Sequence, residues 1–76
     1  MSPEIVFQMM LNNIPGVSNT ISTFLLEKFH NMSKFIETLN TYNSVDSKIS
    51  YISSFKINNR TIPKSTSTNI VNCLFG

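Results

Sequence analysis

The chain has 76 residues, of which 41% are hydrophobic and 13% are charged, and its formal net charge is +2. This length suits one domain near the lower limit for an independent core, and the apolar content excludes a disordered chain. No apolar stretch approaches the length of a membrane span, and the single cysteine, Cys73, excludes an internal disulfide framework. We therefore expect an intracellular protein in a reducing compartment.

Capping residues and apolar spacing predict five short helices, so the expected fold class is all-α. The first helix begins at Ser2 as N-cap, with Pro3 and Glu4 suited to its first turn. The second, third and fifth are expected at about residues 19–30, 32–42 and 63–75, the third with Asn31 or Ser33 as its cap. Ser44 is expected to cap the fourth, which carries Ile49, Ile52 and Phe55 at three-residue spacing. Alternation of period two occurs only over residues 55–57, which is too short to predict a strand.

The connection between the first two helices follows the pattern of a helix-hairpin-helix. Leu11 and Ile14 can bury together on one helical face, Pro15 ends the helical pairing, and Gly16 permits backbone angles closed to other residues. Backbone N–H groups of such a turn, with the N-terminus of the next helix, can bind a phosphate. The alternative is a plain connection in a small helical bundle, without a ligand. The candidate phosphate-binding residues are Pro15, Gly16, Val17, Ser18 and Asn19.

A second, degenerate copy of this pattern follows in the chain. A shift of 45 residues matches Val17 with Ile62, Ser18 with Pro63, Ser22 with Ser67, Leu25 with Ile70, Leu26 with Val71 and Phe29 with Leu74. The second hairpin, residues 56–61, is four residues longer than the first. We therefore predict one domain, residues 1–76, with a first unit at about 5–30, a connecting helix at about 32–42 and a second unit at about 45–76.

Three of the six basic residues gather at the second hairpin. Lys56, Arg60 and Lys64 lie in or beside it, and we predict phosphate contacts for them. The alternative is an ordinary solvated surface, which we prefer for Lys28 beside Glu27. A net charge of +2 is weak for a protein that binds DNA alone, because phosphate neutralisation supplies most of that affinity.

The chain carries more apolar surface than five short helices need. Phe7, Met10, Leu74 and Phe75 are candidates for a dimer interface, and the alternative is that they complete the core. Cys73 lies on the same apolar stripe and is expected to be a buried small residue.

Catalysis by this chain alone is not expected. His30 is the only histidine, and it is placed at a helix end or on the surface. One histidine, one cysteine and four scattered acidic residues predict no catalytic residue, no metal site and no cofactor in this chain.

With both units in view, the chain resembles the C-terminal tandem helix-hairpin-helix domain of the XPF/Mus-type structure-specific endonucleases, closer to the Mus branch. The likeness is carried by residues 10–18 in the first unit, and by Ile52, Phe55, residues 60–63, Ser67 and Ile70 in the second. Pro63 departs from the family, which often has glycine there. Because proline lacks an N–H, one phosphate donor is lost at that hairpin. The second hairpin would then rely on Arg60, on Lys64 and on the N–H groups of Lys64 and Ser65.

The resemblance implies a non-catalytic module that binds duplex arms of branched DNA, independently of sequence, in repair or recombination. It also implies pairing with a like domain, as a homodimer or heterodimer, without a small-molecule or membrane partner. The nuclease domain, with its divalent metal such as Mg²⁺, would be a separate part that these residues do not contain. The expected location is the nucleus in a eukaryote, or the site of viral DNA replication. The alternative is a dimerisation or scaffold domain with little DNA binding of its own.

Overall fold

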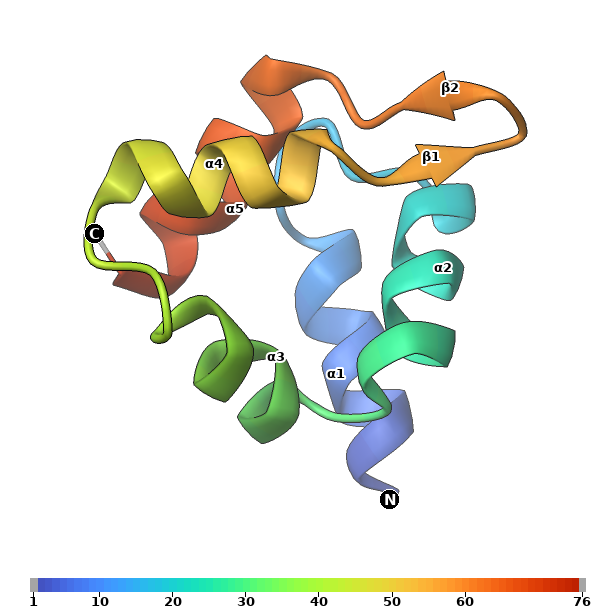
Figure 1. Ribbon diagram of the computed structural model, residues 1–76. Helices are drawn as coiled ribbons and strands as arrows, with labels where there is room; N and C mark the ends of the chain where they lie inside the picture. Colours follow the sequence, from blue (N-terminus) through green and yellow to red (C-terminus); the bar gives the residue numbers. More distant parts are fainter. Residues whose placement is uncertain (1, 76) are drawn as a thin grey trace.

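The computed structural model describes residues 2–75, which form five helices and one small β-hairpin (Figure 1). In chain order these elements are α1 (Pro3–Asn12), α2 (Asn19–Phe29), α3 (Met32–Leu39), α4 (Val45–Ser53), β1 (Lys56–Ile57), β2 (Arg60–Thr61) and α5 (Lys64–Phe75). The prediction of a mainly helical chain with five helices is confirmed. The first and last residues of the predicted domain, 1 and 76, lie outside the described residues. None of the helices within residues 2–75 combines the length and the apolar character that crossing a membrane requires.

Side-chain caps begin four of the helices, as local sequence predicts. The hydroxyls of Ser2, Ser18 and Ser44 each accept a hydrogen bond from the N–H three residues later, at 3.3, 3.3 and 3.1 Å. Of the two predicted caps for α3, Asn31 is the one used, and its Oδ1 accepts from the N–H of Lys34 at 2.9 Å. These bonds satisfy N–H groups that a helix start leaves without partners, so they fix where the helices begin.

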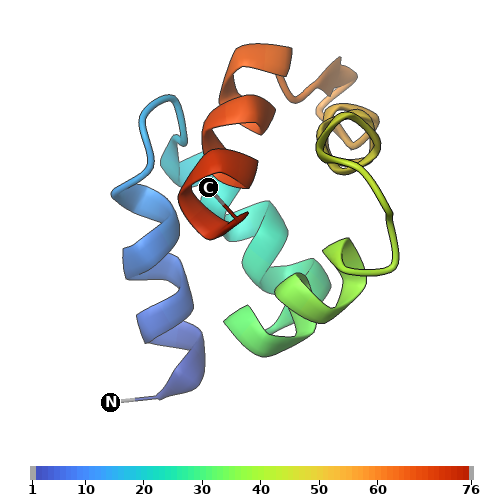
Figure 2. The ribbon, with the colours of Figure 1, turned by 90° about the vertical axis from the view of Figure 1, so that its left-hand side faces the viewer.

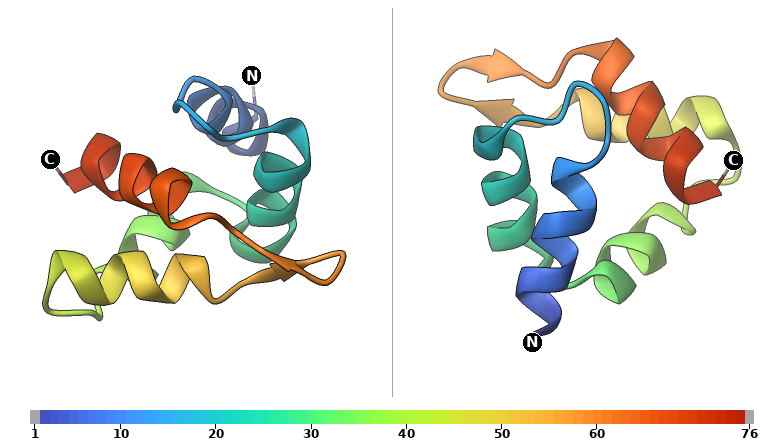
Figure 3. Two further views of the ribbon diagram at one scale, coloured as in Figure 1. Left: turned by 90° about the horizontal axis from the view of Figure 1, so that it is seen from above. Right: turned by 180° about the vertical axis from the view of Figure 1, so that it is seen from behind.

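The helices pack as two pairs joined by a short third element. α1 packs against α2 and α4 packs against α5, while α3 contacts both members of the first pair (Figure 1). One hydrophobic cluster lies between them and consists of Phe7, Leu11, Ile14, Leu25, Phe29, Phe35, Leu39, Ile49, Ile52, Ile62, Ile70 and Val71. The pairing places the α1–α2 loop and the β-hairpin at the same end of the molecule (Figure 1; Figure 3, right).

Two buried serines occupy matching places in the two helix pairs. Ser22 in α2 and Ser67 in α5 are both fully buried, and the 45-residue shift matches them. Each hydroxyl donates to a carbonyl of the preceding turn, Ser22 to Asn19 and Ser67 to Pro63, both at 3.1 Å. A small side chain that satisfies its own polar group lets a neighbouring helix approach closely without burying an unpaired hydroxyl.

The prediction that the chain contains no strand is wrong. β1 and β2 pair antiparallel, with Lys56 opposite Thr61 and Ile57 opposite Arg60. The turn between them uses positive φ angles at Asn58 and Asn59, 52° and 67°, as a two-residue hairpin of type I′ requires. Strands of two residues are too short to show an alternating pattern. The two asparagines of the turn, Asn58 and Asn59, were the signal in the sequence that could have indicated a hairpin.

Three further expectations need correction. The third helix ends at Leu39 and not near Tyr42, because the chain turns through Asn40 as its C-cap. Cys73 is exposed and not buried, because the core side of α5 is formed by Thr66, Ser67, Ile70 and Val71. Phe7 was predicted to contact a partner, but it is fully buried and belongs to the core.

Candidate nucleic-acid interface

The first hairpin is a type II β-turn anchored by apolar side chains. Leu11 and Ile14 are buried at either side of the end of α1, as predicted. The carbonyl of Ile14 accepts from the N–H of Val17 at 3.1 Å, which closes a turn with Pro15 and Gly16 at its centre. Gly16 has φ +88°, the angle that the third position of a type II turn requires. Pro15 and Gly16 are exposed, so the hairpin reaches the surface.

Two side chains of helix α5 donate hydrogen bonds to the backbone of this hairpin. Thr66 Oγ1 donates to the carbonyl of Gly16 at 3.3 Å, and Asn69 Nδ2 donates to the carbonyl of Pro15 at 2.9 Å. Two views place the α1–α2 loop beside the first turns of α5 (Figure 2; Figure 3, right). A Cβ atom at Gly16 would lie 2.7 Å from Thr66 Oγ1. The close packing against Thr66 therefore also requires a glycine at position 16, and the sequence alone did not reveal this contact.

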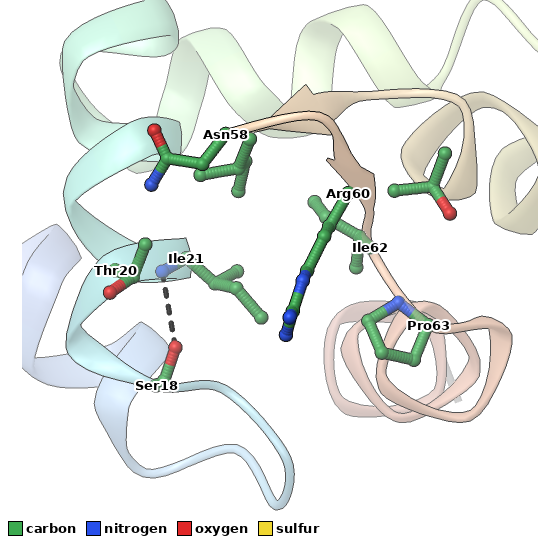
Figure 4. Close-up of a pocket in the computed structure, with 9 residues that line it drawn as sticks. Ser18, Thr20, Ile21, Asn58, Arg60, Ile62 and Pro63 are labelled. Atoms are coloured by element: carbon green, nitrogen blue, oxygen red, sulfur yellow. Dashed lines mark hydrogen bonds between the residues drawn. The ribbon is translucent and has the colours of Figure 1, made fainter.

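The N-terminus of α2 follows directly after the first hairpin. Ser18 uses its hydroxyl to cap the N–H of Ile21, as the dashed line in Figure 4 shows. The first N–H groups of a helix have no partner within it and carry the positive end of the helix dipole. Ser18 and Asn19 are exposed, so this helix start faces solvent.

A hollow of about 580 Å³ separates the start of α2 from the β-hairpin. Its lining comes from both sides and consists of Ser18, Thr20, Ile21, Ile57, Asn58, Arg60, Thr61, Ile62 and Pro63. The Arg60 side chain extends from β2 into the space between the α2 start and Pro63 (Figure 4). A guanidinium group and a helix N-terminus thus face one open concavity, and both favour an anion.

The predicted binding residues do not all meet there. Of the predicted residues, Ser18 and Arg60 line the hollow. Thr20, Asn58 and Thr61 also line it, although they were not predicted to bind. Lys64 borders a different hollow, of about 330 Å³, between the start of α5 and α4. The remaining predicted residues lie outside these two linings: Pro15, Gly16, Asn19, Lys56 and Ser65 are exposed, and Val17 is half-buried.

Two other lysines are occupied by contacts of their own. The ammonium of Lys28 lies 5.1 Å from the ring centre of Phe55, although the side chain is exposed as predicted. Lys48 Nζ donates to the carbonyl of Tyr42 at 2.9 Å and lies 5.0 Å from the ring centre of Phe75. Both cations stabilise aromatic surface by cation–π attraction, whereas Lys56 and Arg60 of the second hairpin are exposed.

A pair of tyrosines lies on the α4 side of the molecule. Tyr42 and Tyr51 stack with ring centres 4.8 Å apart, and Tyr51 meets Phe55 edge-on at the same distance. Burial, and secondarily the neighbouring Tyr42, raise the pKa of the Tyr51 phenol above its usual value. The Tyr51 phenol therefore stays neutral at physiological pH.

An apolar face of α1 is exposed away from the core. Ile5, Val6, Met9 and Met10 are 52%, 39%, 52% and 46% exposed. Met10 is thus at the surface as predicted for a partner contact, and Leu74 is half-buried beside it in a hollow of about 260 Å³. Phe75 is also half-buried. Ile5, Val6 and Met9 were not among the predicted interface residues, because the sequence did not tell which side of α1 would face the core.

Metal-ligating side chains do not gather into a group of three among residues 2–75. His30 is exposed at the C-terminal end of α2, where it was placed from the sequence. The absence of catalytic and metal sites from this chain stays a prediction.

Comparison with known proteins does not assign the chain to a family. No protein-family model matches it, and no curated protein sequence is significantly similar to it. Its function is therefore inferred from its residues and their arrangement in space.

Proposed function

We propose that this chain binds the phosphate backbone of DNA through its two hairpins, as a tandem helix-hairpin-helix module without catalysis of its own. The observation that carries this proposal is the hollow where Arg60 faces the N-terminus of α2 (Figure 4). Arginine and the N–H groups of a helix N-terminus both bind phosphate oxygens without reading sequence.

The placement of the hairpins further supports this function. Both lie at one end of the molecule, and Lys56 and Arg60 are exposed on the strands of the second hairpin. A duplex backbone presents phosphates on two strands, so two donors on one face can bind together where one would bind weakly. The matched serines of α2 and α5 support the assignment of two similar units.

The resemblance to the XPF/Mus-type nucleases gives this binding a biological setting. We propose that the module directs a separate, metal-dependent nuclease domain to branched DNA in repair or recombination. In that setting it acts inside the cell, in the nucleus or at a site of viral DNA replication. The low net charge of +2 fits a module that works beside other DNA-binding parts.

Fluorescence anisotropy with labelled duplex, forked and single-stranded DNA tests this function. We expect binding to duplex and forked DNA that is independent of sequence and weakens steeply with salt. The logarithm of the affinity should fall linearly with the logarithm of salt concentration, by about 0.9 per phosphate neutralised. A protein that fails to bind duplex or forked DNA even at low salt would overturn the proposal.

A second candidate function is association with a like domain, and the exposed apolar face of α1 favours it. Ile5, Val6, Met9 and Met10 form a continuous stripe on that helix, and Glu4 is the only charged residue in α1. Apolar side chains gathered on one helix side are typical of a surface that a partner covers.

Analytical ultracentrifugation tests this association. We expect the wild type to form dimers at high concentration and Met9→Glu to remain monomeric, because the carboxylate would be buried without a partner. Val45→Glu is the matched control, since Val45 is 49% exposed at the start of α4 and not on α1. If both variants dimerise like the wild type, the α1 face is not the interface; a monomeric wild type removes the candidate altogether.

A further inference from the structure

The peptide bond between Pro15 and Gly16 has a fixed direction relative to α5. Its carbonyl accepts a hydrogen bond from Asn69 Nδ2 at 2.9 Å, so the oxygen points toward that helix. In a planar trans peptide, the C=O and the N–H point in opposite directions. The N–H of Gly16 therefore points away from α5.

A second contact from the same helix holds the next carbonyl. Thr66 is 4% exposed, and its hydroxyl donates to the carbonyl of Gly16 at 3.3 Å. A turn closed by Ile14 and Val17 could also adopt type I, in which the central peptide is rotated and φ at Gly16 is negative. Bonds from Thr66 and Asn69 to both central carbonyls favour the type II form, in which φ at Gly16 is +88°.

We propose that Thr66 and Asn69 are positioning residues that present the Gly16 N–H to a DNA phosphate. This inference rests on the proposed DNA binding. It specifies which N–H of the first hairpin binds the phosphate and which residues orient that N–H. The N–H of the central peptide belongs to Gly16, and the preceding residue, Pro15, has no N–H to offer. A phosphate oxygen accepting from this N–H would be held next to the helix start at Ser18.

The proposal requires the hydrogen-bond donors and not merely the shapes of the two side chains. Asn69→Ala removes the amide, and Asn69→Asp keeps the shape while replacing the donor with an oxygen. Asn72 is exposed on the same helix, so Asn72→Ala and Asn72→Asp are the matched controls for truncation and for added negative charge. Thr66→Val removes the second donor, whereas Thr66→Ser retains it.

Two measurements test the proposal, and each is made well below the melting temperatures of the variants. The first is the ¹H–¹⁵N NMR signal of the Gly16 amide, recorded before and after addition of a DNA duplex. The second is anisotropy with that duplex across a range of salt concentrations. We expect the wild-type Gly16 signal to shift strongly on DNA addition, and the shift to be lost in both Asn69 variants and in Thr66→Val.

Affinity for the duplex should fall about tenfold in Asn69→Ala, the usual loss for one hydrogen bond to a charged group. Its salt slope should stay unchanged, since no cation is removed. Thr66→Ser and Asn72→Ala should bind the duplex with wild-type affinity, and Asn69→Asp should bind it more weakly than Asn72→Asp.

Several results would overturn the positioning role. Wild-type affinity and a wild-type Gly16 shift in Asn69→Ala and Thr66→Val exclude it while leaving DNA binding intact. DNA binding in the wild type without any shift of the Gly16 signal means that another donor contacts the phosphate. Failure of the wild type to bind DNA removes the proposed function first, and the positioning role with it.

Discussion

Replacement of Gly16 by alanine is expected to lower stability by about 2–3 kcal/mol, and so to lower the melting temperature of this small domain by about 10–20 °C. Two separate costs add. A residue with a Cβ is strained at φ +88°, by about 1–2 kcal/mol. The new Cβ would also lie 2.7 Å from Thr66 Oγ1, which has to move and weaken its bond to the Gly16 carbonyl.

A double-mutant cycle with Thr66→Ala separates the two costs, measured by thermal and urea unfolding. Removing the Thr66 hydroxyl removes the close contact but leaves the backbone strain, so Gly16→Ala should cost less in that background. Asn13→Ala, at an exposed position of the same loop with negative φ, should change the melting temperature little. Equal costs in both backgrounds would contradict the steric cost, and the absence of a cost in either background would exclude a positive φ at Gly16.

Gly16 is consequently a poor probe of DNA contact, although its place in the motif suggests otherwise. The sequence predicted a glycine there because the turn uses backbone angles closed to other residues. The structure supplies a second reason, the contact with Thr66 fifty positions along the chain. Loss of DNA binding in a Gly16 variant would therefore not distinguish a missing phosphate contact from a disturbed fold.

Local interactions explain what the sequence predicted well. A serine or asparagine N-cap bonds to an N–H three residues later, so Ser2, Ser18 and Ser44 carry their signal within one helical turn. The small residues Ser22 and Ser67 were matched by spacing alone, and both are buried. Such features require no knowledge of how distant segments come together.

Long-range packing explains what was missed. α1 is apolar on more than one side, and only contact with α2 and α3 determines that Phe7 faces inward and Met9 outward. Bonds from Thr66 and Asn69 to the first hairpin join residues 50 and 54 positions apart, so no local pattern could indicate them.

The same limit applies to the basic residues of the candidate site. Lys56, Arg60 and Lys64 lie close together in the sequence, but the structure does not bring them to one hollow. Arg60 enters the hollow beside α2, whereas Lys64 borders another next to α4. Only the three-dimensional structure therefore selects Arg60 as the residue to test.

Substitution of Arg60 should separate specific phosphate contact from general charge attraction. Arg60→Ala is expected to weaken duplex binding about tenfold and to reduce the salt slope by about 0.9, the change for one phosphate contact. Arg60→Glu should weaken binding further, because a carboxylate would then face the start of α2 across the hollow (Figure 4) and repel the phosphate. Neither change should alter the melting temperature much, since Arg60 is exposed.

Lys34→Glu is the matched control for net charge. Lys34 is exposed on α3, away from both hairpins (Figure 1). Lys34→Glu and Arg60→Glu each change the net charge from +2 to 0. Anisotropy at several salt concentrations should show a much larger loss for Arg60→Glu than for Lys34→Glu. Equal losses would mean that DNA is attracted by overall charge, and the hollow would have no special role. A smaller salt slope in Arg60→Ala alone would place one phosphate at the hollow between α2 and the β-hairpin, where the guanidinium and the helix dipole act on it together.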